Sequence, residues 1–365
     1  MNINPRLIVN KKTGKLLLNY YVPRPLQEIE KELVFDIDLL QSLMDTKEAL
    51  STMGKLYWSE DYNKYLDLFR KREAYFSLLI SQFRIHHLDL FLQKHPKNLE
   101  LEGYQQAYIY ALEHDYDDFL AFNKTLNKLV VHNPLKKPGE FRNTLIVNNT
   151  FCIPVHPHEI KSTLHLFAHY LEGDTKLPHL IKAALLYYQY LVISPFLDGN
   201  HRQARILLSV FFRKNNLCNG CPFSISKYLY LYKIQYRKAI DEVRFNGDYQ
   251  NWISTFLLIV KKAAKNTTEI LEKAKKINDK NRKIILNSEY SNTIKKNLLQ
   301  ILSYLELNPV IDIKKAAFEM GKTYPTIANC FEILQNLEII YCINDFKRNR
   351  LYEYREHLNN IFDTN

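Results

Sequence analysis

Glycine is scarce in this 365-residue chain. It has 9 glycines, well below the share of about 7% in an average composition. Phosphate-binding loops of the Walker or dinucleotide type need clustered glycines, and the lack of such a cluster excludes those classes. The five cysteines are odd in number and scattered, which excludes a disulfide framework. No apolar run approaches 18 residues, and the first residues lack the apolar core of a signal peptide. We therefore expect a cytoplasmic protein that has no contact with membranes.

The composition is that of a folded protein. Hydrophobic residues make up 46% and charged residues 24%, a balance that supports a large core, and the length suggests two or three domains. The many tyrosines and phenylalanines, together with few glycines, favour helices over turn-rich sheets. Lysine and arginine exceed aspartate and glutamate by 11. That excess permits binding to nucleic acid or to an acidic partner, but we favour the simpler explanation of a solvated lysine-rich surface.

The hydrophobic pattern predicts a chain of helices with one β-hairpin. Apolar residues recur every three or four positions from Pro25 to about Leu129 and again from Glu159 onward. Residues 177–192 are nearly all apolar and predict a central buried helix. Residues 143–157 alternate apolar and polar around an Asn-Asn pair, which predicts a short hairpin. We divide the chain into an N-terminal helical region, a core, a basic helical linker and a C-terminal domain, at residues 1–115, 116–260, 261–290 and 291–365.

The last two segments differ from the core in character. Residues 261–290 are rich in lysine with almost no large apolar face, so we expect an exposed helical linker. Residues 291–365 predict three helices followed by two β-prone segments, the pattern of a winged helix. Its wing carries Lys347, Arg348 and Arg350, which could bind the phosphate backbone of DNA. The alternative is a domain that packs on the core or on a protein partner.

One short segment carries the chemistry. Asp198, Gly199 and Asn200 form a tight turn that leads directly into a helix, whose first N–H groups attract anions. Arg202 and Arg205 lie three residues apart on one face of that helix. Asp198 offers a hard oxygen ligand for Mg²⁺ beside a phosphate. Together these residues suggest a nucleotide-phosphate site; the alternative is a capped helix with two arginines in solvent.

This segment resembles the signature of the Fic (Fic/DOC) family. The family motif reads His-Pro-Phe-x-Asp-Gly-Asn-Gly-Arg-x-x-Arg, and residues 194–205 read SPFLDGNHRQAR. Other segments are similar to the family's PGEFR sequence, flap end, GDW-x-x-W sequence and appended winged helix, at residues 138–142, 153–154, 246–252, and 324–326 with 348–352. The resemblance implies an all-α fold: a Fic-type helical core at 116–260 with a small β-hairpin flap, followed by a winged helix-turn-helix domain.

The resemblance also implies a function. Active Fic proteins transfer AMP from Mg-ATP to a hydroxyl group of a target protein, which makes ATP and Mg²⁺ the implied cofactors. Ser194 and Asp198 occupy the catalytic positions, Asp198 is the metal ligand, and the phosphates lie on Gly199, Asn200, His201, Arg202 and Arg205. The flap aligns the target by strand addition. The target protein is not identified by the sequence, and a homodimer is left open.

The departures from the family pattern predict impaired transfer. Ser194 stands in place of the histidine that acts as general base, and loss of such a base typically costs about 10²–10⁴-fold in rate. His201 replaces the second glycine of the phosphate turn and crowds it. Many members carry an inhibitory Ser-x-x-x-Glu-Gly motif, and here Ser81 stands in place of its glutamate. Elsewhere Tyr187, Leu191 and Tyr232 replace a histidine, a glutamate and an asparagine.

The leading hypothesis is therefore a degenerate, nucleotide-binding relative of the AMP transferases. One alternative is an active nucleotidyl- or phosphotransferase that uses His201 or His156 as a non-standard base. Another is a DNA-binding regulator that acts through the winged helix. The C-x-x-C sequence at 218–221 and the pair His165 and His169 have metal-ligand spacing, but we interpret them as a helix end and an amphipathic helix face.

Overall fold

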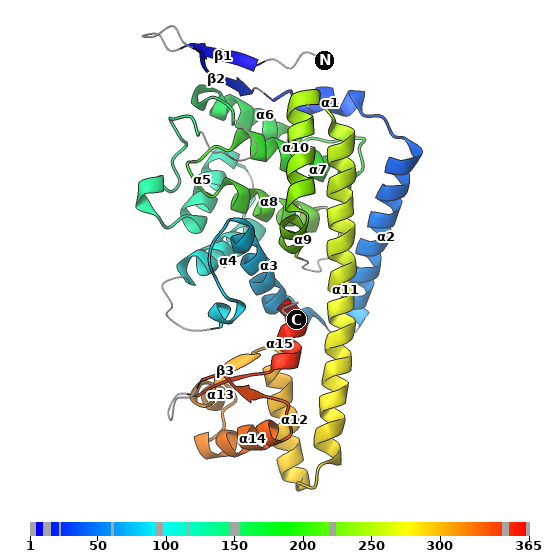
Figure 1. The fold of residues 1–365 in the computed structure, drawn as a ribbon, viewed down its shortest axis with the longest axis vertical. Helices are drawn as coiled ribbons and strands as arrows, with labels where there is room; N and C mark the ends of the chain where they lie inside the picture. The colour runs from blue at the N-terminus through cyan, green and yellow to red at the C-terminus, as the bar shows by residue number, and fades with distance from the viewer. Residues whose placement is uncertain are drawn as a thin grey trace.

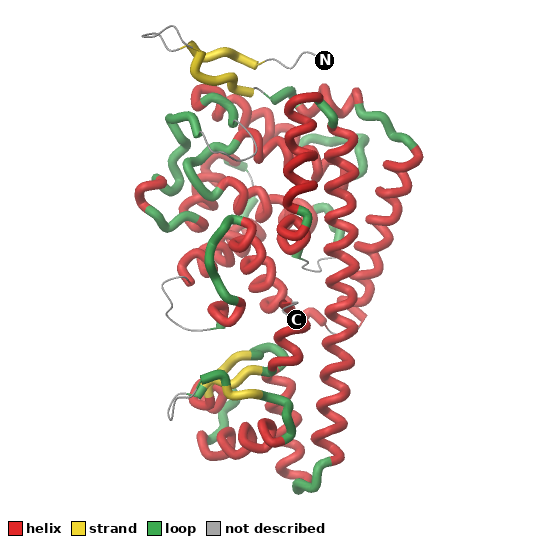
Figure 2. The backbone as a smooth tube through the Cα atoms, viewed as in Figure 1, coloured by secondary structure: helices red, strands yellow, loops and turns green. Residues whose placement is uncertain are grey.

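The computed structural model describes the chain except for residues 1–4, 10–15, 22, 60–61, 92–97, 116, 147–153, 219–223, 345–349 and 363–365. Helices dominate, as Figure 2 shows, which confirms the expected all-α class. The N-terminal region adds an antiparallel pair that the sequence pattern does not predict, β1 (Pro5–Val9) and β2 (Leu16–Tyr21). In the described part of the chain, no helix combines the length and apolar character needed to cross a membrane.

The main body is a helical assembly that forms the upper part of Figure 1. Its first half contains α1 (Leu26–Glu32), α2 (Ile37–Ser59), α3 (Leu66–Ile80), α4 (Asn98–Glu113) and α5 (Phe119–Val130). Its second half contains α6 (Ile160–Glu172), α7 (His179–Ile193), α8 (Asn200–Lys214), α9 (Ile225–Leu231), α10 (Lys233–Asn246) and α11 (Tyr249–Asn287).

Helix α7 is the centre of this assembly. Every residue from Leu180 to Ile193 is buried, as expected for a helix that is apolar on all sides. Trp252 of α11 stacks on Tyr187 with ring centroids 6.2 Å apart, and its indole N–H donates to the carbonyl of Ala184 (2.9 Å). Because α8 follows α7 after a six-residue turn, this packing holds the start of α8 in place.

Helix α11 spans 39 residues, about 58 Å at 1.5 Å per residue, and runs beside both parts of the molecule (Figure 1). It contains most of the segment that the sequence predicts to be an exposed linker. Most of its lysines are exposed, but a stripe that includes Ile270, Leu271, Ala274 and Ile277 is buried. The expectation of an exposed helix is therefore wrong for one face, because apolar residues at helical spacing lie between the lysines and pack there.

The C-terminal unit contains three helices and a small sheet. The helices are α12 (Asn292–Leu305), α13 (Ile313–Glu319) and α14 (Tyr324–Asn336), whose first turns are capped by Ser291, Asp312 and Thr323. The sheet has the order β3-β5-β4 with antiparallel neighbours, from β3 (Val310–Asp312), β4 (Tyr341–Cys342) and β5 (Leu351–Glu353). A separate apolar core includes Leu298, Phe331 and Tyr352. The assignment of this unit as a winged helix stays a prediction.

The expected flap hairpin lies mostly outside the described residues. Its centre, 147–153, is not described, and the flanks 143–146 and 154–156 are not in strands. These flanks nevertheless lie close to the end of α7, because the backbone N–H of Val155 donates to the carbonyl of Val192 (3.2 Å).

The last helix, α15 (Arg355–Phe362), joins the C-terminal unit to the main body. The Phe362 ring contacts Tyr75 of α3, His87 and Phe91, with centroid distances of 5.8, 5.7 and 6.1 Å. A polar contact lies nearby: the carboxylate of Glu306 accepts from Lys64 Nζ and from the Tyr65 hydroxyl, both at 2.9 Å. The two parts of the molecule are therefore joined through α3 and the turn before it.

We expect Phe362→Ala to lower the free energy of unfolding by about 3–5 kcal/mol, because it leaves a cavity where a fully buried ring packs on α3. Urea denaturation measures this change. Phe318→Ala is the matched control, since that ring is 87% exposed on α13, and we expect a change within about 0.5 kcal/mol. Equal changes in the free energy of unfolding for the two variants would contradict the described packing of α15 on α3.

Candidate functional site

The turn between α7 and α8 has two residues with left-handed backbone. Ser194 has φ of 39° and Gly199 has φ of 82°. A Cβ at position 199 would lie 2.7 Å from Val131 Cγ2 and 3.1 Å from Asn127 Nδ2. Only glycine combines that conformation with so close an approach to α5. Gly199 is thus required by packing, whatever ligand the turn binds.

Asn200 and Asp198 have different roles in this turn. The Asn200 side chain bonds the backbone of Phe196 twice, accepting from its N–H (2.9 Å) and donating to its carbonyl (2.8 Å). Asn200 therefore braces the turn. Asp198 Oδ1 accepts from the N–H of Gly199 (2.6 Å), and its side chain is 44% exposed. The Asp198 carboxylate therefore remains accessible to a ligand.

Ser194 ends α7 and is buried. Its hydroxyl donates to the carbonyl of Leu191 at 2.6 Å, so its proton satisfies a carbonyl of the last helical turn. Arg142 binds the same helix end: its side chain donates to the carbonyls of Ser194 (2.8 Å), Ile193 (3.2 Å) and Val155. Burial lowers the pKa of Arg142 to about 10. Ser194 is a helix-capping residue in this geometry. Arg142, which also donates to the carbonyl of Thr144 (3.1 Å), joins both flanks of segment 147–153 to it.

Arg202 is 2% exposed and heavily bonded. Its Nη1 donates to Glu100 of α4 and to the carbonyl of Val130, and its Nη2 lies 3.4 Å from Asp198 Oδ2. The guanidinium also lies 5.0 Å from the centre of the Phe83 ring. Two carboxylates thus balance its charge. No sequence pattern indicates the Glu100 partner, which lies 102 positions away.

Arg205 is 1% exposed and is bound by α3 instead. Its Nε donates to Ser77 Oγ (2.9 Å), and its Nη2 donates to the Ser77 carbonyl (2.8 Å) and to Ser81 Oγ (2.9 Å). The residue at the inhibitory-motif position, Ser81, therefore touches the second arginine of the motif. Gln82, at the position of that motif's glycine, has φ of 66°.

Neither alternative base is well suited to accept a proton. His201 lies in the first turn of α8, and burial together with the nearby charges of Arg205 and Arg237 lowers its pKa to about 4. So low a pKa makes it a weak base near neutral pH. His156 caps the short helix Pro157–Glu159 by accepting from the N–H of His158 (3.4 Å). It is not among the residues that line the cavity described next.

A cavity of about 400 Å³ lies over the start of α8. Segment 79–83 at the end of α3, Ile146 and Pro154, the turn at 194–202 and α10 form its walls. The α10 residues were missed by sequence analysis, although their spacing is a signal: Lys233, Tyr236, Arg237 and Ile240 lie on one face of that helix. Of the other departures, Leu191 lines the cavity and Tyr232 does not.

The remaining candidate residues lie apart from this cavity. His165 and His169 are exposed on α6, and Cys218 is buried. Within the described ranges, no three His, Cys, Asp or Glu residues cluster as a metal site. A phosphate-bound Mg²⁺ needs fewer protein ligands, since it keeps waters and takes phosphate oxygens. The half-exposed carboxylate of Asp198 fits that requirement.

Comparison with known proteins identifies the central part of the chain. Residues 113–212 match the family model described as the Fic/DOC family. This segment is a Fic/DOC domain. Fic domains generally transfer a nucleotide or another group to proteins.

Two solved structures have the same fold. A Fic family protein from Desulfovibrio desulfuricans is 12% identical, with a TM-score of 0.57 over 88% of this chain and 97% of that one. A Fic domain containing signaling protein from Bacteroides thetaiotaomicron is 18% identical, with a TM-score of 0.52 over 63% of this chain and 97% of that one. At sequence identities this low, the two matches show a shared fold and nothing further. The first match extends well beyond the Fic domain.

We expect Ser81→Glu to weaken ADP binding by about tenfold or more, because a carboxylate there would pair with Arg205 and repel an anion. Calorimetric titration of the natural chain and the variant measures the change. Ser81→Gln is the matched control, since it adds similar bulk without charge. An equal loss of affinity in both variants would mean that bulk at this position, and not charge, governs the site.

Proposed function

We propose that this chain is a nucleotide-binding Fic-domain protein, related to the protein adenylyltransferases, in which transfer is weak or absent. The observation that carries the proposal is the state of Ser194, at the position of the family's base. Its hydroxyl is buried and donates to the carbonyl of Leu191. A serine hydroxyl has no useful basicity at neutral pH, and this one already uses its proton.

The nucleotide half of the proposal rests on the cavity. Arg202 and Arg205 lie beside the first turn of α8, whose backbone N–H groups favour an anion. Asp198 is the residue that would hold Mg²⁺ with ATP, where the ion would neutralise phosphate charge. The volume of the cavity falls within the range of small-molecule sites, about 300–1,000 Å³.

An active transferase with a non-standard base is the competing proposal. His201 lies within the motif and is the one histidine among the described residues that line the cavity, and its low pKa leaves the ring neutral but weakly basic. A base is most effective when its pKa lies near the working pH. Because the pKa of His201 lies well below neutral pH, we favour the proposal of impaired transfer over that of an active transferase.

We expect the natural chain to transfer no measurable AMP and the double variant Ser194→His, His201→Gly to gain transfer. The first change restores a base at a position whose left-handed backbone histidine tolerates, and the second reopens the phosphate turn. The assay follows label from ATP carried on the α-phosphate and, separately, on the γ-phosphate.

The matched controls are Ser194→Ala and His201→Gly alone, which restore no base. Transfer by the natural chain that Ser194→Ala abolishes would overturn the proposal. Transfer that disappears instead in His201→Gly would establish His201 as the base.

A second proposal concerns the C-terminal unit, which we propose binds duplex DNA. A groove of about 1,300 Å³ runs along the exposed face of α14 and is bordered by Arg350. Lys347 and Arg348, the other predicted wing residues, lie outside the described residues. Asp312, Glu332 and Lys314 also line the groove, so its own charges nearly cancel and we assign the attraction to phosphate mainly to the basic wing.

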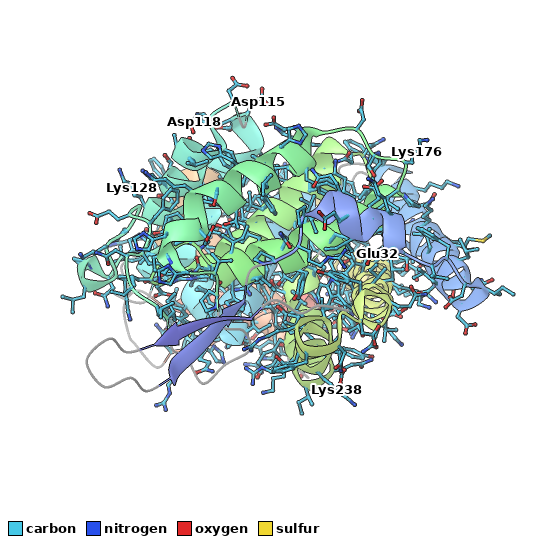
Figure 3. The ribbon with its side chains drawn as sticks, turned by 90° about the horizontal axis from the view of Figure 1, so that it is seen from above. Glu32, Asp115, Asp118, Lys128, Lys176 and Lys238 are labelled. Atoms are coloured by element: carbon cyan, nitrogen blue, oxygen red, sulfur yellow. The ribbon has the colours of Figure 1, made fainter. Side chains whose placement is uncertain are left out.

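We expect Arg348→Ala with Arg350→Ala to weaken duplex binding and to reduce the slope of log affinity against log salt by about two, roughly one for each lost phosphate contact. Fluorescence anisotropy at several salt concentrations measures both. Lys176→Ala, an exposed lysine in the loop between α6 and α7 (labelled in Figure 3), is the control. Absent or salt-independent binding would reject this second proposal.

A further inference from the structure

The cavity of the Fic domain carries an excess of positive charge. Arg202, Arg205, Lys233 and Arg237 line it, and Asp198 is the only carboxylate among its lining residues in the described part of the chain. Two of these cations come from α10, outside the Fic signature. A partly closed cavity with this balance favours an anionic ligand.

The two motif arginines differ in how their charge is compensated. Arg202 pairs with both Glu100 and Asp198, so its charge is already balanced. Arg205 donates to neutral oxygens of Ser77 and Ser81, and no ion pair among the described residues involves it. Its direct acceptors are therefore neutral, and the carboxyl group of Glu73 acts on its charge only from beyond ion-pair distance. Arg205 is thus more available to an anion than Arg202.

Arg237 lies in the same electrostatic environment as Arg205. It follows Tyr236 on α10, and both side chains line the cavity. The charges of Arg205 and Arg237 both act on the imidazole of His201, which lies in the first turn of α8. Arg205 and Arg237 therefore approach the same part of the cavity from two helices.

We propose that Arg205 and Arg237 together bind the diphosphate group of a nucleotide, and that Arg202 is a structural residue of this site. This inference rests on the proposed nucleotide-binding function. A diphosphate carries charge on two neighbouring phosphates, so it can contact two guanidinium groups at once, each with planar donors suited to phosphate oxygens. A single phosphate gives up one of these contacts.

The test compares Arg237→Ala with Lys238→Ala by calorimetric titration with ADP, AMP and inorganic pyrophosphate, with EDTA present so that metal makes no contribution. Lys238 follows Arg237 on α10 but is exposed at the rim of the molecule (Figure 3) and does not line the cavity. We expect Arg237→Ala to weaken ADP and pyrophosphate binding by about tenfold or more, with a smaller effect on AMP. Lys238→Ala should stay within about twofold, and Arg237→Lys should recover part of the loss.

The outcomes separate this inference from the function on which it rests. If the natural chain binds none of the three probes at millimolar concentration, nucleotide binding fails and the arginine pair fails with it. If the natural chain binds ADP but Arg237→Ala and Lys238→Ala behave alike, the pair is rejected and nucleotide binding stands. An equal loss for AMP and ADP in Arg237→Ala would also reject the diphosphate assignment. Thermal unfolding of each variant verifies that it is folded.

Discussion

The site depends on the burial of Arg205 against α3. A guanidinium group has five N–H donors and no acceptor, so burying it requires oxygens close by. Ser77 and Ser81 supply them, one helical turn apart. Because these contacts join α3 to α8, they also bring segment 79–83 over the start of α8, where it forms one wall of the cavity. The shape of the cavity and the position of its second arginine thus follow from one set of hydrogen bonds.

The same helix connects the cavity to the C-terminal unit. Tyr75 lies two residues before Ser77 and packs on the Phe362 ring of α15. Glu73, also on α3, accepts from the backbone N–H of Ser226 (3.1 Å) at the start of α9. Burial raises the pKa of the Glu73 carboxyl group. Helix α3 is therefore held by the C-terminal unit, by α9 and by Arg205. Its position reflects all three contacts, so the C-terminal unit forms part of the support of the cavity.

Sequence reasoning reached those parts of the site that local pattern encodes. The turn at 198–200, the helix that follows it and the position of Ser81 all come from contiguous motifs, and the structure brings Ser81 to Arg205. Contacts between distant segments leave no such pattern: Glu100 with Arg202, or Arg237 beside His201. The buried face of α11 was missed for a different reason, because its apolar residues, among them Ile270, Leu271 and Ile277, are interspersed with many lysines. The N-terminal hairpin lies before the first helical pattern and carries no glycine-containing two-residue turn signal.

His201, at a position where the resemblance to the Fic signature predicts glycine, acts through space and charge, and not through backbone strain. His201 lies within α8 and has a helical backbone, a conformation that needs no glycine, in contrast to Gly199 with its left-handed φ. Its cost is the volume that the ring takes from the cavity at the start of the helix. Its low pKa means that the ring adds no positive charge to offset this loss. A neutral imidazole can still donate one hydrogen bond, so the attraction for an anion in this region has to come from the neighbouring guanidinium groups.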